Sequence, residues 1–237
     1  LLAFLIAYLL AKYRANLSQD WTTQQVDDLI FYGALGAVLG GRLGYMIFYS
    51  FPSFLANPLI FLDFQNGGMS FHGGFLGVLL AMLLFNRKSK KSFFQTTDFI
   101  APLVPLGLAF GRIGNYINAE LWGKVTTSAW GIYAPDLSGM WAQRYPTQVF
   151  EAFLEGVVLF LILWLFSQKN RPLMATSSLF LIFYGFFRFI IEFIRVPDSQ
   201  LGYLAFEWLT MGQLLSFPMF VIGLYLFYRS YYSEKKL

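Results

Sequence analysis

Long apolar blocks separated by short polar connections constrain this chain more than any other feature. The blocks are about 17 to 25 residues long, which is the length that a helix needs to cross the hydrocarbon core of a membrane. Hydrophobic residues make up 57% of the 237 residues, and charged residues make up 13%. Soluble domains carry roughly 25% charged residues. A soluble domain is therefore excluded as the first interpretation, and the sequence predicts an all-α polytopic membrane protein.

Seven transmembrane helices are expected. The first apolar run, residues 1–10, is too short to span a membrane. We interpret it as part of a truncated first helix rather than a signal peptide, because no basic segment precedes it and Lys12 and Arg14 follow it. The other segments lie at about 24–50, 70–86, 94–116, 147–167, 175–195 and 208–229. Residues 1–237 are expected to form a single integral-membrane domain.

The basic residues of the connections predict an orientation. One side collects eleven of them, and the other side collects only Lys124 and Arg144. Because lysine and arginine are enriched in cytoplasmic loops, the N-terminus is expected outside and the C-terminus in the cytoplasm, with residues 50–70 and 119–146 exterior. The eleven are Lys12, Arg14, Arg87, Lys88, Lys90, Lys91, Lys169, Arg171, Arg229, Lys235 and Lys236.

The exterior segment 119–146 is expected to be a small interfacial arm. It contains Trp122, Trp130 and Trp141 among glycine, proline and serine residues, a composition that suits the headgroup region of a bilayer. The formal net charge of +4 does not indicate a nucleic-acid partner, because the basic residues lie in short loops. Cysteine is absent, so disulfides, thiolate metal sites and a cysteine nucleophile of the protein are excluded.

Polar residues within the spans gather toward the exterior half of the membrane. An arginine in a span costs several kcal/mol unless it snorkels, pairs or lines a polar cavity. Four arginines need such a reason, and other polar side chains lie at outer helix ends. The convergence predicts a site open to the outer leaflet. The residues are Arg42, Arg112, Arg188, Arg195, His72, Asn115, Glu120 and Glu151.

Spacing gives some of these residues a geometry. Tyr184, Arg188 and Glu192 are four residues apart and share one helix face, so Arg188 can pair with Glu192. This pair is either part of a site or a structural ion pair. Two arginines, Arg112 and Arg188, that reach one polar pocket within lipid suit an anionic headgroup, because guanidinium binds phosphate in a bidentate manner.

His72 lies between glycines at the start of the third span. It is either a structural histidine or the general base of the outer cluster. The glycines of the second span predict close helix packing rather than a nucleotide loop, because no strand precedes them and no P-loop lysine follows. They are Gly33, Gly36, Gly40, Gly41 and Gly44.

Three blocks of sequence resemble the bacterial prolipoprotein diacylglyceryl transferase family, and the resemblance covers nearly the whole chain. The most specific block is the Arg-x-Gly-Asn-x-x-Asn-x-Glu pattern, which begins at Arg112. Shorter pieces, Gly-Gly-Arg42, Arg195-x-Pro-Asp and Met211-Gly-Gln, follow in the expected order. The three blocks are residues 67–74, 111–123 and 184–192.

The resemblance implies a seven-helix enzyme of the bacterial inner membrane with its active site toward the exterior. Such an enzyme transfers the diacylglyceryl group of phosphatidylglycerol to the thiol of the lipobox cysteine in a prolipoprotein and releases glycerol phosphate, and it requires no metal or cofactor. The partners implied are phosphatidylglycerol, the prolipoprotein signal peptide and membrane lipids. Residue by residue, it places at or beside the reaction site His72, Arg112, Asn115, Glu120, Gly123, Tyr184, Arg188 and Glu192.

The expected roles follow from chemistry and from the resemblance together. Arg112 and Arg188 hold the phosphate and neutralise charge on the leaving group. His72 assists deprotonation of the thiol, with Glu120 as the alternative base or as a partner of an arginine. Asn115, Glu120 and Tyr184 orient and donate or accept hydrogen bonds. The lipid-binding set comprises Arg112, Asn115, Gly123, Arg188 and Glu192.

Two features depart from the family pattern. A tyrosine of the first helix would lie upstream of Leu1, and Tyr145 stands where the family more often has histidine. Two other functions use the same arginines: a phospholipid-binding protein or lipid transporter without chemistry, and a hydrolase that passes the same group to water. The outer bias of the polar residues favours the transferase over a transporter, because alternating access needs a site reachable from both faces.

Overall fold

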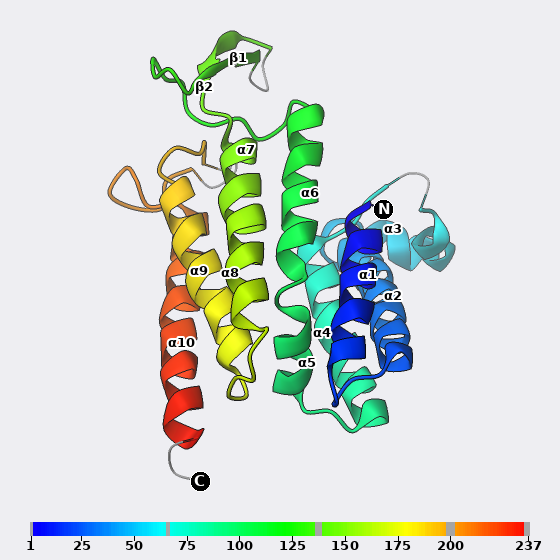
Figure 1. Cartoon of the computed structure of the whole chain (residues 1–237). Coiled ribbons are helices and arrows are strands. Elements are labelled where there is room, and N and C mark those ends of the chain that lie inside the picture. Colours follow the sequence, from blue (N-terminus) through cyan, green and yellow to red (C-terminus); the bar gives the residue numbers. More distant parts are fainter. Residues whose placement is uncertain (1, 65–66, 136–138, 198–201, 235–237) are drawn as a thin grey trace. The chain divides into compact units, whose positions relative to one another are not determined.

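The structure, a computed structural model, describes residues 2–64, 67–135, 139–197 and 202–234. Lys235 and Lys236 of the loop count, and Asp198 of the Arg195 motif, lie outside these ranges. Within them, the regular structure is almost entirely helical, as the sequence predicts. The chain forms two compact units, residues 8–96 and residues 97–237 together with 1–7. Each unit is described below by itself (Figure 1).

The unit of residues 8–96 is built on two long helices. Thr22 caps the second of them through a capping box, in which its side chain accepts from the backbone N–H of Gln25 and the Gln25 side chain accepts from that of Thr22. The elements are α1 (Leu2–Leu17), α2 (Thr23–Tyr49), α3 (Phe51–Ala56), the short helix η1 (Pro58–Leu62) and α4 (Phe71–Ser89).

Helices α2 and α4 pack through glycines. A Cβ on Gly40 would lie 2.4 Å from the carbonyl oxygen of Gly73, and a Cβ on Gly73 would lie 2.4 Å from that of Gly40. Gly36 and Gly77 approach each other in the same way, with a Cβ on Gly36 2.5 Å from the Gly77 oxygen. The interpretation of these glycines as close helix packing is therefore confirmed. Gly33 does not take part, because a Cβ there would have nothing within 4 Å.

Arg42 is buried against backbone carbonyl groups. Its five N–H groups are directed at the carbonyl oxygens of five residues, among them those of Phe61 and Gly68 at 3.0 Å and Ile60 at 2.6 Å. The other two acceptors are the carbonyls of Asp63 and Gly67. The side chain thus organises the connection between η1 and α4. Its donors are all engaged, so it has none left for a ligand.

The unit of residues 97–237 places four helical segments side by side (Figure 1). Its core contains Leu159, Leu163 and Phe187, with Phe183 and Tyr184 packed against them. The elements are α5 (Phe93–Ile100), α6 (Val104–Ile117), β1 (Ile132–Pro135), β2 (Trp141–Arg144), α7 (Thr147–Glu151), the π-helical segment η2 (Ala152–Val158), α8 (Leu159–Phe166), α9 (Ala175–Ile191) and α10 (Met211–Glu234).

Three described helices are long and apolar enough to cross a membrane. They are α2, the continuous helix of α7, η2 and α8, and α10. The pair α5 and α6 makes a fourth candidate, although it bends by 50° at residues 101–103. We expected one span over 94–116. The bend follows from Pro102 and Pro105, which remove backbone donors and interrupt the helix.

The segment between α6 and α7 contains a short antiparallel hairpin. Strand β1 pairs with β2, and Tyr133 lies opposite Gln143. The segment is attached near the end of α9, because the N–H of Lys124 donates to the carbonyl of Ile194 at 2.9 Å and Gly123 forms a bridge with Arg195. Figure 1 shows the hairpin beyond the ends of α6 and α7.

Candidate active site

Glu151 is the point at which three arginine side chains meet. It is the last residue of α7 and is fully buried. Its Oε2 lies 2.9 Å from Nε of Arg112, and its Oε1 lies 2.9 Å from Nη1 of Arg195. The same Oε1 accepts a hydrogen bond from Nη1 of Arg188. One carboxylate therefore joins α6, α9 and the segment that follows α9.

Glu192 is a second buried carboxylate of the same cluster. Its Oε1 lies 2.5 Å from Nη2 of Arg188 and 3.5 Å from Nε of Arg195. The hydroxyl of Thr210 donates to its Oε2 at 2.7 Å. The ion pair between Arg188 and Glu192 that the four-residue spacing predicts is confirmed.

Gly212, the second residue of α10, is a glycine for a steric reason. A Cβ on Gly212 would lie 2.5 Å from the carboxyl carbon of Glu192. The absent side chain leaves room for the carboxylate between α9 and the start of α10. The Met211-Gly-Gln piece of the sequence therefore has a steric role at the cluster.

Arg112 and Arg188, which are expected to bind the phosphate, differ in how many of their guanidinium N–H groups are already engaged. Arg188 uses both terminal nitrogens, one toward Glu151 and one toward Glu192. Arg112 pairs with Glu151 through Nε, and its Nη1 and Nη2 donate no hydrogen bond to a described residue. The Arg112 side chain keeps 20% of its surface exposed. Its terminal fork is the part of the cluster best able to take an anion.

Asn115, Glu120 and Gly123 lie in the turn that follows α6. The Nδ2 of Asn115 donates to Oε2 of Glu120 at 3.2 Å, and the Glu120 N–H donates to the Asn115 carbonyl at 2.8 Å. Ala119 and Leu121, on either side of Glu120, both have positive φ. The turn is tied to α7, because the hydroxyl of Thr147 donates to the Leu121 carbonyl at 2.8 Å. None of the described ion pairs of the cluster involves Glu120, which contacts Asn115 instead of an arginine.

Tyr184 lies one helical turn before Arg188 on α9. Its ring stacks on that of Phe180, with centroids 5.5 Å apart and an interplanar angle of 4°. It also packs against the core formed by Leu159, Leu163 and Phe187. The ring is thus held in place beside the arginine cluster by apolar contacts.

His72 and Arg42 belong to the other compact unit. His72 is exposed in the first turn of α4, where its ring meets that of Phe71 edge to face. The turn is fixed by Ser70, whose hydroxyl accepts from the Gly73 N–H at 3.2 Å and whose own N–H donates to the Gly41 carbonyl at 2.9 Å. The imidazole is therefore accessible and held at a defined helix start.

Glu151 is expected from the sequence only as one of the polar residues at outer helix ends, without a role, and Glu155 is not among the expected site residues. Glu155 lies in η2, is fully buried, and has its Oε1 3.9 Å from Nη1 of Arg188. Two acids four residues apart inside a strongly apolar span are a signal in themselves, because ionisable residues in spans are rare and costly. The π-helical geometry around Glu155 also indicates a functional site, since such segments are frequent at functional sites.

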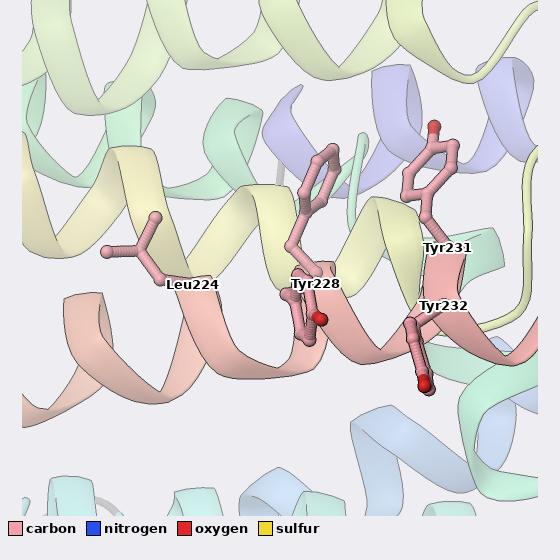
Figure 2. A pocket seen from close by; sticks show the side chains of 5 residues that line it. Leu224, Tyr228, Tyr231 and Tyr232 are labelled. Carbon is pink, nitrogen blue, oxygen red and sulfur yellow. The ribbon is translucent and has the colours of Figure 1, made fainter.

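A second feature of this unit is a shallow apolar depression on α10. Figure 2 shows its lining, which comes from one helix and contains no charged group. The lining residues are Leu224, Phe227, Tyr228, Tyr231 and Tyr232.

Comparison with known proteins bears on the whole chain. The family model described as prolipoprotein diacylglyceryl transferase matches residues 1–229. The phosphatidylglycerol–prolipoprotein diacylglyceryl transferase of Pseudomonas fluorescens is 55% identical over 95% of this chain and 84% of its own length. The proteins of the same name from Coxiella burnetii and Solidesulfovibrio magneticus are 54% and 56% identical, over 100% and 97% of this chain and 90% and 87% of theirs.

Proposed function

Because the chain belongs to the prolipoprotein diacylglyceryl transferase family, we propose that it transfers the diacylglyceryl group of phosphatidylglycerol to the thiol of a lipobox cysteine in a prolipoprotein. Relatives of this name match it over 84–90% of their own length. The chain has no cysteine, so the thiol belongs to the acceptor. The observation that carries the proposal is the convergence of three arginines on Glu151 with the terminal fork of Arg112 still open.

The phosphate of phosphatidylglycerol binds at the Arg112 fork in this proposal. A guanidinium presents two parallel N–H groups that match two phosphate oxygens. Arg188 adds positive charge close by, although its terminal nitrogens are already held by carboxylates. Asn115, Gly123 and Glu192 line the same region through the turn after α6 and the end of α9.

The reaction forms one bond and breaks one. The acceptor sulfur, as thiolate, attacks the glyceryl carbon that carries the phosphate ester. The carbon–oxygen bond breaks, and its electron pair stays on the phosphate oxygen, so that glycerol phosphate leaves. Arg112 and Arg188 stabilise the charge that develops on this leaving group, as preorganised cations do.

The thiol proton needs an acceptor. We assign it to His72, directly or through a water molecule, because the imidazole is exposed at the start of α4. Glu120 is the alternative base, since its carboxylate is exposed and accepts a hydrogen bond from the Asn115 side chain. Tyr184 orients the substrate from its stacked position on α9.

We place the chain in the bacterial inner membrane with seven spans, the N-terminus and residues 119–146 outside, and the C-terminus in the cytoplasm. Two groups of exposed aromatic residues support this arrangement. Trp130, Tyr133 and Trp141 are 60–72% exposed on the arm, and Tyr228 and Tyr232 are 67% and 47% exposed near the end of α10. Aromatic residues concentrate at both interfaces of a bilayer. The active site then faces the exterior, where exported prolipoproteins arrive.

The test is a transfer assay with phosphatidylglycerol and two lipobox peptides that differ only in Cys or Ser at the acceptor position. Labelled diacylglyceryl is expected on the Cys peptide alone. Release of diacylglycerol without a peptide adduct would instead indicate a hydrolase. Arginine-dependent lipid binding with no transfer and no release would indicate a lipid-binding protein or transporter.

A further inference from the structure

We infer that Glu151 sets the charge of the arginine cluster so that it fits a singly charged phosphodiester better than a doubly charged phosphate monoester. The inference rests on the proposed function, because it concerns how that substrate is distinguished from its product. Phosphatidylglycerol carries one negative charge on its phosphodiester, whereas released glycerol phosphate carries up to two. In the transition state the second charge is still shared with the breaking carbon–oxygen bond, and the arginines stabilise it there. The released glycerol phosphate carries that charge in full, so a site that prefers the singly charged state binds the substrate and releases the product.

The arginine cluster contains more positive than negative charge. Arg112, Arg188 and Arg195 supply three positive charges, and Glu151 and Glu192 are in direct ion pairs with them. These pairs leave one positive charge without a carboxylate partner. A bound monoanion neutralises this charge. A bound dianion leaves one uncompensated negative charge in a buried site, which is energetically unfavourable.

Glu155 is the third buried acid of the cluster, after Glu151 and Glu192. Neither of its carboxylate oxygens has a hydrogen-bond partner among the described residues, and the closest guanidinium nitrogen is Nη1 of Arg188 at 3.9 Å. An ionised carboxylate that is fully buried without hydrogen bonds is strongly disfavoured. We therefore count Glu155 as neutral, which keeps the balance of the cluster at one positive charge.

Glu151 also positions the three arginine side chains. The ion pair between Glu151 and Arg112 brings Oε2 within 2.9 Å of Nε, and Nη1 and Nη2 donate no hydrogen bond to a described residue, so they remain for the ligand. The other carboxylate oxygen of Glu151 holds Arg188 and Arg195. Glu151 therefore acts through the arginines as a positioning residue. The negative charge of Glu151 also sets the net charge of the cluster, which is +1 with this carboxylate and would be +2 without it.

The experiment compares two soluble competitors on the full chain: glycerophosphoglycerol, a singly charged phosphodiester, and glycerol phosphate at a pH at which it carries two charges. Each is measured as an inhibitor of transfer and, without any peptide, as a ligand that raises the melting temperature in detergent. The wild type is expected to prefer glycerophosphoglycerol. Glu151→Gln keeps the shape and removes the charge, and should shift the preference about tenfold or more toward glycerol phosphate.

Matched variants separate charge from fold. Glu155→Gln lies on the same helix with the same burial and exchanges one neutral group for another, so it should keep the wild-type preference. Glu151→Asp keeps the charge and should keep the preference, even though its shorter side chain lowers the transfer rate. If Glu151→Gln does not fold, Glu192→Gln removes the other paired charge and must shift the preference in the same direction.

Each outcome bears on one of the two proposals. A wild-type preference that persists in the folded Glu151→Gln protein, or an equal shift in Glu155→Gln, overturns the inference and leaves the transferase intact. Ligand preferences that behave as expected in a chain with no transfer to the Cys peptide overturn the proposed function and leave the charge-setting role of Glu151 standing.

Discussion

Nε of Arg112 lies 2.9 Å from Oε2 of Glu151, and neither terminal nitrogen of the guanidinium donates a hydrogen bond to a described residue. An arginine inside an apolar protein is normally satisfied on all sides, as Arg42 is by five backbone carbonyls. Arg112 is different, because only one edge is engaged and the rest of the side chain is partly exposed. Arg112 is therefore held by Glu151 while its terminal N–H groups can bind an anion.

This geometry predicts the result of replacing Arg112 with lysine. Arg112→Lys keeps the positive charge, but an ammonium group cannot hold Glu151 on one side and present a flat two-pronged edge on the other. We expect the kcat/KM for phosphatidylglycerol to fall by about 100-fold, which corresponds to roughly 2.7 kcal/mol of transition-state stabilisation. The comparison is Arg171→Lys, at the connection after α8, where Nε donates to the Phe166 carbonyl. A retained rate in Arg112→Lys would show that charge alone is sufficient.

The contact between Gly212 and Glu192 predicts a steric effect on the cluster. In Gly212→Ala the new methyl group would lie 2.5 Å from the carboxyl carbon of Glu192 and must displace it. We expect a loss of about 1–3 kcal/mol in stability, together with lower transfer activity. Gly107→Ala on α6 is the control, because a Cβ there meets nothing within 4 Å. Equal melting temperatures and activities for the two variants would refute the steric role.

The glycine packing of α2 on α4 offers a matched pair within one helix. Gly40→Ala places a methyl group 2.4 Å from the Gly73 carbonyl oxygen, so the two backbones must separate. We expect a loss of about 3 kcal/mol, seen as a lower melting temperature in detergent. Gly33→Ala has open space and should leave stability unchanged or raise it, since alanine favours a helix by about 1 kcal/mol over glycine. The same loss at both positions would mean that close approach is not what the glycines provide.

The assignment of the base is tested by His72→Gln and Glu120→Gln. If His72 accepts the thiol proton, His72→Gln should lower kcat by about 100-fold or more while lipid binding is unchanged, because positioned proton transfer contributes on this scale. Glu120→Gln should then cost much less, since the amide can still accept a hydrogen bond from Asn115. The reverse order of the two effects would move the base to Glu120.

The sequence predicts the helices well, because apolar length is a local property. Each expected segment coincides with a helix or a helical pair, from Thr23–Tyr49 to Met211–Glu234. The single span expected over 94–116 did not include the bend between α5 and α6, although Pro102 and Pro105 indicate a break in the helix. The apolar composition of that segment indicates one span, whereas the prolines interrupt the helix within it.

The site could be predicted only in part. Spacing along one helix was enough to pair Arg188 with Glu192, and this pair is confirmed. The role of Glu151 depends on contacts with residues 37 and 44 positions away, and such distances follow from how helices pack rather than from any local pattern. Family resemblance pointed to the arginines but not to the carboxylate that holds them together. The same limit applies to Thr210 and Gly212, which reach Glu192 from the start of α10.

The position of the lipid phosphorus in an experimental structure of the protein bound to phosphatidylglycerol tests the proposed site most directly. Phosphate oxygens are expected within hydrogen-bond distance of Nη1 and Nη2 of Arg112, with Nε still in contact with Glu151, to which it lies at 2.9 Å without the lipid. A phosphate bound elsewhere, with Nη1 and Nη2 of Arg112 unoccupied, would contradict the proposal.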